Sequence, residues 1–135
     1  MEIIDKISLS KIRLEYAKES LGAAEDLLKL ERYKDAANRS YYAVFHSMRA
    51  VLAFDGIDRK KHSSVMAEFR KLYIKTNIFP NKMSDMITSL FEIRINSDYM
   101  DFYILPKKDV KEQIKNAKFF IKEVEKFLKA KYKQN

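Results

Sequence analysis

Glycine and proline are rare in this chain, with two of each among 135 residues. Tight turns and strand connections depend on these two residue types, so their scarcity disfavours a β or α/β fold with many short loops. The chain is also 47% hydrophobic and 13% aromatic, which is enough apolar surface to stabilise one domain. We therefore expect long helices within a single domain that spans residues 1–135.

The spacing of apolar residues predicts where these helices lie. Leu14, Ala17, Leu21, Ala24 and Leu28 recur at alternating intervals of three and four, which marks one face of a helix. This helix is predicted to begin at Ser8 or Ser10, either of which can cap it, and to end near Leu30. Similar patterns predict four more helices over residues 33–54, 63–75, 80–99 and 106–128. The predicted fold is all-α, an up-and-down bundle of about five helices.

Four residues are expected to mark helix ends. Gly56 can adopt the left-handed conformation that stops the second helix, and Asn77 is a candidate terminator of the third. Pro80 and Pro106 fit the first turns of the fourth and fifth helices, where a missing backbone N–H costs little.

Several function classes are disfavoured by what the sequence lacks. It has no cysteine and two histidines, so disulfides, thiolate catalysis and Cys-ligated metal sites are excluded, and we expect neither a metal nor a cofactor. The N-terminus carries Glu2 and Asp5 without a long apolar run, so it does not read as a signal peptide. No window approaches the ~20 apolar residues of a membrane span. These features predict a cytoplasmic protein that does not associate with a membrane.

The net charge of +8 is concentrated near the C-terminus. Residues 1–105 contain 17 basic and 15 acidic residues, a balance of +2, whereas residues 106–135 contain 10 and 4, a balance of +6. Seven lysines of the last predicted helix form a stripe beside its apolar face: Lys108, Lys111, Lys115, Lys118, Lys122, Lys126 and Lys129. Such a stripe is commonly a solvated helix flank. Alternatively Lys111, Lys115, Lys118 and Lys122 bind a nucleic-acid backbone.

Two histidines are candidates for acid–base chemistry, since histidine titrates near neutral pH. Arg39, Tyr42, His46 and Arg49 share one side of the second helix, which would suit a polar groove for an anion. The simpler interpretation is that His46 is a buried, satisfied histidine and that His62 begins the third helix beside two lysines.

The end of the fourth helix carries a second candidate site. Arg94 and Asp98 lie one helical turn apart, and Asn96, Ser97 and Tyr99 add further donors and acceptors. The pair is either an intrahelical ion pair worth ~0.2–0.5 kcal/mol or an arginine available to hold a phosphate.

Adjacent aromatic residues in the last helix suggest a second apolar face. Phe119 and Phe120 point about 100° apart, and Phe127 falls near the face of Phe120. A homodimer is the simplest way to cover such a face, and a wide core is the alternative.

Three segments together resemble a HEPN domain: RYKDAANRSYYAVFHSMRAVL, KHSSVMAEFRKLYIKTN and FEIRINSDY, followed by a basic last helix. The resemblance extends from about Ser10 to Leu128 and is strongest to the small prokaryotic branch often encoded beside a minimal nucleotidyltransferase. It implies a helical bundle, usually dimeric, that acts in RNA metabolism or in toxin–antitoxin systems.

The resemblance also implies which residues carry the function. Active HEPN ribonucleases cut RNA without a metal. Their motif is an Arg, a polar residue next to it, and a His after four to six residues that intervene between the Arg and the His. Arg94 falls at the position of this Arg, but Ile95 follows it, and Tyr99, Met100 and Asp101 occupy the His positions. In some HEPN–nucleotidyltransferase pairs the partner modifies a Tyr just beyond the motif, for which Tyr99 and Tyr103 are the analogues.

These observations leave three hypotheses. The leading one is a module without strong catalysis that pairs with a minimal nucleotidyltransferase and binds RNA or a nucleotide through Arg39, Arg49, Arg94, Asn96 and the four lysines. The alternative is a metal-independent endoribonuclease in which Arg94, Asp98 and Tyr99 work with His46 or another proton-transfer group. The third is a structural helical protein whose cations keep it in solution.

Overall fold

The computed structural model describes residues 2–134 of the chain, with the side chain of residue 4 also outside the description. It is all-α, as predicted, and contains α1 (Ile3–Lys29), α2 (Tyr33–Phe54), α3 (His62–Phe69), α4 (Lys82–Tyr99) and α5 (Lys107–Lys133). A five-residue π-helix, η1 (Arg70–Ile74), continues α3. In the described part of the chain no helix is long and apolar enough to cross a membrane.

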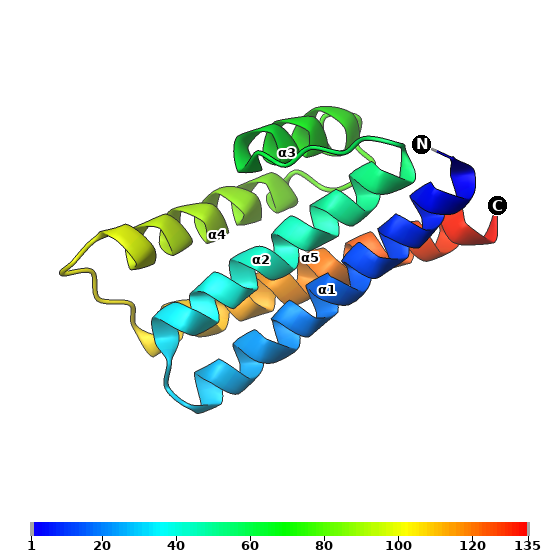
Figure 1. Cartoon of the computed structure of the whole chain (residues 1–135). Coiled ribbons are helices and arrows are strands. Elements are labelled where there is room, and N and C mark those ends of the chain that lie inside the picture. The colour runs from blue at the N-terminus through cyan, green and yellow to red at the C-terminus, as the bar shows by residue number, and fades with distance from the viewer. Residues whose placement is uncertain (1, 135) are drawn as a thin grey trace.

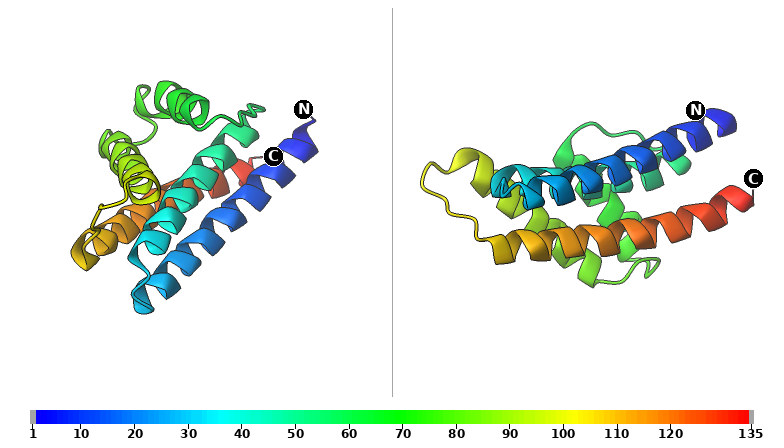
Figure 2. Two further views of the ribbon diagram at one scale, coloured as in Figure 1. Left: turned by 60° about the vertical axis from the view of Figure 1, so that its left-hand side comes forward. Right: turned by 90° about the horizontal axis from the view of Figure 1, so that it is seen from below.

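The helix α2 lies at the centre of the bundle and contacts α1, α3, α4 and α5 (Figure 1). Seen from below, α1 and α5 run side by side in opposite directions, with the two chain ends together at one end of the bundle (Figure 2). The central position of α2 explains its nearly continuous apolar second half, because side chains on several faces of this helix are buried. Its buried alanines, among them Ala36 and Ala37, pack with Ala24 of α1, and such small side chains let the two helices approach closely.

The helix ends differ in part from the sequence-based expectation. The first helix begins at Ile3, so neither Ser8 nor Ser10 caps it. Ser10 is instead fully buried within α1, where its hydroxyl donates to the carbonyl of Ala50 at 2.7 Å and lies 2.6 Å from the hydroxyl of Tyr132. These contacts tie α1 to α2 and α5, and they show that a tertiary role outweighed the capping preference of serine.

Gly56 and Asn77 do adopt left-handed backbone conformations after α2 and η1, with φ of 77° and 63°. Pro80 does not open the fourth helix, because α4 begins two residues later at Lys82. Pro106 lies at the N-cap of α5, one residue before its predicted place inside the helix.

The aromatic residues of α5 are absorbed by the bundle core. Phe120 is fully buried against Phe69, with ring centroids 5.5 Å apart, and Phe127 is half-buried with its ring 5.2 Å from that of Phe79. Phe119 is also half-buried and lies beneath the ammonium of Lys82, 4.1 Å from its ring centroid. The expected second apolar face therefore packs within the chain, against η1 and the turn before α4, and gives no reason to infer a dimer.

Candidate functional site

A cluster of rings joins α2 to the start of α3. Tyr41, Tyr42, Phe45 and His46 follow one side of α2, and His62 reaches them from the first residue of α3. The imidazole of His62 lies nearly parallel to two of these rings, 4.2 Å from the centroid of Phe45 and 5.6 Å from that of Tyr41. Residues 41, 42, 45 and 46 meet because helix positions one turn apart lie over each other.

A hydrogen bond fixes the protonation of the His62 ring. The hydroxyl of Tyr41 lies 2.6 Å from Nδ1 of His62, and Tyr41 is 1% exposed. If the imidazole were the donor, the buried hydroxyl hydrogen of Tyr41 would need another acceptor, and the described residues supply none. Tyr41 therefore donates to Nδ1, which leaves the ring hydrogen of neutral His62 on Nε2.

Burial keeps both groups of this bond uncharged near neutral pH. It raises the pKa of Tyr41 far above the ordinary phenol value, although the positive charge of Arg94 opposes part of the rise. Burial also lowers the pKa of His62 below 6.5, and the charges of Arg94 and Arg49 lower it further. The neutral His62 ring is thus a hydrogen-bond donor at Nε2 rather than a base.

Arg94 of α4 rests on the same ring cluster. The centre of its guanidinium lies 5.3 Å from the ring centroid of Tyr41 and 5.4 Å from that of Tyr42, which is cation–π geometry. Its Nη2 donates to the hydroxyl of Tyr42 at 3.3 Å, and its Nε lies 3.1 Å from the Asp98 carboxylate. Arg94 and Asp98 therefore form an ion pair, one of the two alternatives that their spacing left open. The side chain of Arg94 is 16% exposed, and these contacts with Tyr41, Tyr42 and Asp98 hold its guanidinium in one place. We call Arg94, Asp98, Tyr41, Tyr42 and His62 the Arg94 site.

His46 lies beside this site on the far side of Tyr42. Its ring contacts those of Tyr42, at 6.0 Å, and Tyr16, at 5.8 Å. Burial lowers the pKa of His46, and the charges of Arg49, Arg39 and Arg13 lower it further, so the ring is neutral at pH 7. The predicted alignment of Arg39, Tyr42, His46 and Arg49 is present: the Arg39 guanidinium lies 5.2 Å from the Tyr42 ring centroid.

The two arginines that flank His46 on α2 differ in whether a carboxylate pairs with them. Arg49 lies 5.9 Å from the ring centroid of Phe45 and pairs with Asp58 at 2.9 Å, a carboxylate that also holds Arg13. This pairing lowers the pKa of Asp58, first through its hydrogen bond with Arg49. Arg39 lies over the Tyr42 ring and, among the described residues, donates only to the neutral amide of Asn38, so no carboxylate there pairs with its charge.

The remaining predicted site residues lie elsewhere. Tyr99 is 72% exposed and Asn96 is half-buried, and among the described residues neither forms a hydrogen bond, ion pair or cation–π contact with Arg94. Lys111, Lys115 and Lys118 line a hollow between α1 and α5, whereas Arg94 packs on α2. Lys118 pairs there with Glu25 at 3.2 Å, and Lys122 is exposed on α5 outside that hollow. The structure therefore brings Arg94, Asp98 and His46 into one region and leaves Tyr99 and the lysines out of it.

The simpler interpretation of His62, a residue that begins the third helix, does not include its contacts with Tyr41 and Phe45. The signal that pointed to them was the KHS segment together with YYAVFH, since these segments carried the family resemblance. Among the described residues there is no group of three or more His, Asp or Glu placed to hold a metal.

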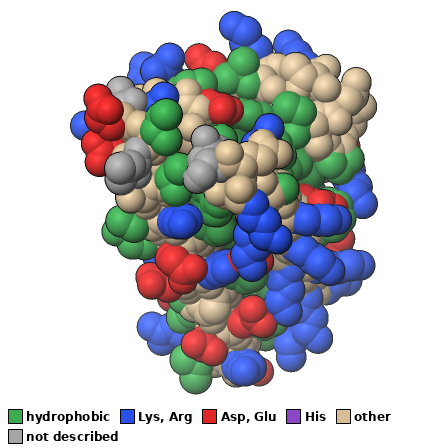
Figure 3. Space-filling model, turned by 90° about the vertical axis from the view of Figure 1, so that its right-hand side faces the viewer, with side chains coloured by type: hydrophobic (Ala, Val, Ile, Leu, Met, Phe, Trp, Pro, Cys, Tyr) green, Lys and Arg blue, Asp and Glu red, His purple; other side chains and the backbone are tan. Residues whose placement is uncertain are grey.

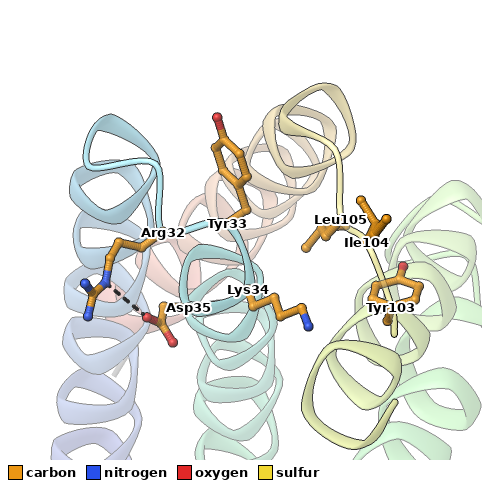
Figure 4. A pocket seen from close by; sticks show the side chains of 7 residues that line it. All are labelled: Arg32, Tyr33, Lys34, Asp35, Tyr103, Ile104 and Leu105. Atoms are coloured by element: carbon orange, nitrogen blue, oxygen red, sulfur yellow. Dashed lines mark ion pairs between the residues drawn. The ribbon is translucent and has the colours of Figure 1, made fainter. Parts of the chain in front are cut away.

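A separate hollow of about 440 Å³ lies where the α1–α2 turn meets the α4–α5 connection (Figure 4). Tyr103, Ile104 and Leu105 form one wall, and Lys34 extends toward Tyr103 from the other, while the hydroxyl of Tyr33 points away (Figure 4). Tyr103 is half-buried in this wall. Of Tyr99 and Tyr103, the two tyrosines nearest after Arg94, Tyr99 is the more exposed.

The positive charge is uneven over the surface. On the face that carries the chain ends, Lys and Arg side chains crowd one side and carboxylates are scattered on the other (Figure 3). A surface of this kind attracts anions over a distance of about one Debye length, ~8 Å at physiological salt. The Arg94 site holds one fixed cation, which pairs with the Asp98 carboxylate at 3.1 Å and lies beside neutral imidazoles.

An all-α bundle that carries Arg94 on its fourth helix is the arrangement that the resemblance to HEPN domains implies. The chain belongs to the HEPN domain family, whose sequence model matches residues 10–127. It is 35% identical over 112 residues to a UPF0332 protein of Thermotoga maritima, covering 83% of this chain and 85% of that protein. It is 32% identical over 128 residues to a protein of Methanocaldococcus jannaschii named "Putative toxin MJ0142", covering 95% and 86%.

Solved structures share the fold. TT1696 from Thermus thermophilus superposes with a TM-score of 0.74 at 18% identity, covering 87% of this chain and 96% of that one. ST0689, described as an archaeal HEPN homologue, superposes with a TM-score of 0.62 at 18% identity, covering 88% and 97%. At this level of identity the likeness shows the fold alone.

Proposed function

We propose that this HEPN domain is a toxin-like module that binds RNA or a nucleotide through a phosphate at Arg94 and that works with a minimal nucleotidyltransferase. The observation that carries the proposal is the guanidinium of Arg94, held on the rings of Tyr41 and Tyr42 with its Nη1 unpaired among the described residues. Arginine presents a rigid fork of donors that matches phosphate oxygens. The toxin-like role is supported by relatives that bear the name of toxins.

Binding is favoured over cleavage by the state of the histidines. Metal-free cleavage through the ribose 2′-hydroxyl requires a group that accepts its proton and another that protonates the leaving oxygen. His62 has its acceptor nitrogen bonded to Tyr41, so it can donate to a phosphate but cannot take a proton in this arrangement. Tyr99 occupies one of the positions at which active HEPN ribonucleases carry the His. It is 72% exposed and, among the described residues, forms no hydrogen bond or ring contact with Arg94.

The test is binding of a fluorescent single-stranded RNA and of AMP in EDTA, compared between the wild type and Arg94→Ala. Loss of a charge-assisted contact worth ~1.5–3 kcal/mol lowers affinity about ten- to hundredfold. Arg59→Ala is the matched control, because Arg59 is a half-exposed arginine that pairs with Glu68 away from the ring cluster. Equal losses for the two variants would refute a phosphate site at Arg94.

A second candidate, a metal-independent endoribonuclease, is favoured by one observation. His46 is neutral at pH 7, and its ring nitrogens make no hydrogen bond with the described residues, so it is free to act as a base across Tyr42 from Arg94. RNA incubated in EDTA at high protein concentration separates the two functions. Cleavage that is lost in both Arg94→Ala and His46→Gln supports the enzyme, and intact RNA removes it.

We also propose that the domain acts as a homodimer through the segment that follows α4. Met100, Phe102 and Ile104 are each more than half exposed, within five residues of one another. Such an apolar surface next to a charged site is typical of an interaction surface. Sedimentation of the wild type and of a Phe102→Asp, Ile104→Asp variant tests this: the wild type is expected to be dimeric and the variant monomeric. A monomeric wild type, or a dimeric variant, would reject this dimer surface.

The proposed partner has its own test. Co-expression with a minimal nucleotidyltransferase from the same genome should give a stable complex, and failure to co-purify would count against the pairing. If the partner modifies this chain, Tyr99 is the expected target, because its hydroxyl is accessible and that of Tyr103 lies in a wall of the hollow at the α1–α2 turn. Mass spectrometry of Tyr99→Phe and Tyr103→Phe variants after incubation with nucleoside triphosphate identifies the site.

A further inference from the structure

A groove between α1 and α5 combines an apolar floor with a cationic rim. Leu28 and Ile114 form the floor, Lys29, Lys111, Lys115 and Lys118 surround it together with Glu25, and its volume is about 360 Å³. Leu28 is half-buried and Ile114 is 6% exposed, so both present apolar atoms at the bottom of the groove. We call these seven residues the lysine groove.

The lysine groove continues along α5. An adjoining hollow of about 490 Å³ is lined by Lys107, Lys108, Lys111, Glu112 and Lys115, so the two hollows share Lys111 and Lys115. Together they contain six lysines and two carboxylates, and one of these carboxylates, Glu25, is already neutralised by Lys118 at 3.2 Å. Lys111 and Lys115 form no ion pair with the described residues. The groove therefore retains an excess of unbalanced positive charge.

The chemistry of the groove distinguishes between its conceivable occupants. A nucleic-acid backbone would be attracted by the lysines, but it gains nothing from Leu28 and Ile114. Unpaired bases bind by stacking on aromatic rings, and the residues that line the lysine groove include none. An amphipathic helix with aliphatic side chains on one face and carboxylates on both flanks matches both parts of the groove, since its apolar face fits the floor and its carboxylates meet the rim.

We infer that the lysine groove is a docking site for an acidic amphipathic helix of a partner protein. This inference rests on the proposed function in one respect, that the domain works with a partner. The groove is distinct from the Arg94 site, because its lining comes from α1 and α5 whereas Arg94 of α4 packs on rings of α2. The domain can accordingly hold a phosphate at one site and a partner helix at the other.

The test uses a synthetic peptide of about 20 residues, long enough to be helical, with Leu at three-four spacing and Glu on both flanks. A second peptide has the same composition with the Leu positions scrambled. Fluorescence anisotropy measures the affinity of each peptide for the wild type and for two variants. One variant combines Lys111→Glu with Lys115→Glu, and the matched control combines Lys122→Glu with Lys126→Glu, which lie on the same helix outside the groove.

The amphipathic peptide is expected to bind the wild type, to lose about tenfold or more in affinity for the groove variant, and to stay within about twofold for the control. Equal binding of the scrambled peptide, equal losses in both variants, or no binding to the wild type would each overturn the inference. So would a groove variant that loses RNA binding while it keeps the peptide. Arg94→Ala should leave peptide binding unchanged, so a failure of the phosphate site can be recognised separately.

Discussion

Tyr41 of α2 donates its hydroxyl hydrogen to Nδ1 of His62 in α3 across 2.6 Å, and Arg94 of α4 lies over the same tyrosine ring. One buried phenol therefore joins three helices and determines which nitrogen of His62 faces outward with a hydrogen. In the proposed phosphate site, His62 donates a hydrogen bond from Nε2 and Arg94 supplies the fixed charge.

Removing this hydroxyl should change both stability and the state of His62. Tyr41→Phe keeps the ring and loses a hydrogen bond, which is expected to cost ~0.5–1.5 kcal/mol in the free energy of unfolding. Nitrogen NMR of the wild type should show the Nε2–H tautomer of His62, and the variant should lose this preference. Tyr16→Phe is the control, because Tyr16 is half-exposed and makes no hydrogen bond with the described residues. An Nδ1–H tautomer in the wild type would contradict the assignment.

The free energy of unfolding should be smaller at pH 5 than at pH 7.5. The pKa values of His46 and His62 lie below 6.5 in the folded state, because burial and nearby arginines disfavour their protonated forms. The unfolded chain then binds more protons than the folded chain, so this contribution is complete above pH 6.5 and is lost as the pH falls through the folded pKa values. Urea unfolding at pH 7.5 and pH 5 should show the decrease.

The carboxylates do not account for a change in this range. The pKa values of Asp58 and Glu125 are lowered by their cationic partners, so their contribution is lost only at more acidic pH. A variant with His46→Gln and His62→Gln should therefore show a smaller change in unfolding free energy between pH 7.5 and pH 5. The same pH dependence in this variant would refute the explanation.

Two phenylalanines should differ sharply in their importance to the fold. Phe120 is fully buried in α5, so Phe120→Ala is expected to cost ~3–5 kcal/mol of stability. Phe102 is 97% exposed after α4, and Phe102→Ala should change stability by less than about 0.5 kcal/mol. Chemical denaturation measures both values at a protein concentration where dimerisation does not contribute. Similar costs for the two variants would mean that the placement of α5 is wrong.

The fold could be predicted because its determinants are local. The three-four apolar pattern and the scarcity of glycine and proline were enough to predict five helices, and Gly56 adopts the expected left-handed conformation. The start of α1 was predicted too late, because Ser10 serves the contact with Ala50 and Tyr132 rather than a cap. Contacts between residues distant in sequence leave no periodic signal that would have revealed this role.

In the candidate site too, contacts within one helix could be predicted from the sequence, and contacts between helices could not. The Arg94–Asp98 pair was predicted because it lies within one helical turn. The contact of Tyr41 with His62 joins residues 21 positions apart across a loop, so spacing could not reveal it. The lysine stripe was correctly predicted as a pattern, but its relation to Leu28 of α1 depends on how α1 and α5 pack.

The most direct test of the account follows individual groups of the Arg94 site during titration with AMP or a short single-stranded RNA. Nitrogen-edited NMR resolves the Arg94 guanidinium and His62 Nε2 separately from the lysine ammonium groups of α5. The account predicts that the Arg94 and His62 signals shift together with one affinity, and that Arg94→Ala abolishes the His62 shift. Shifts confined to the lysines, with Arg94 and His62 unchanged at saturation, would contradict it.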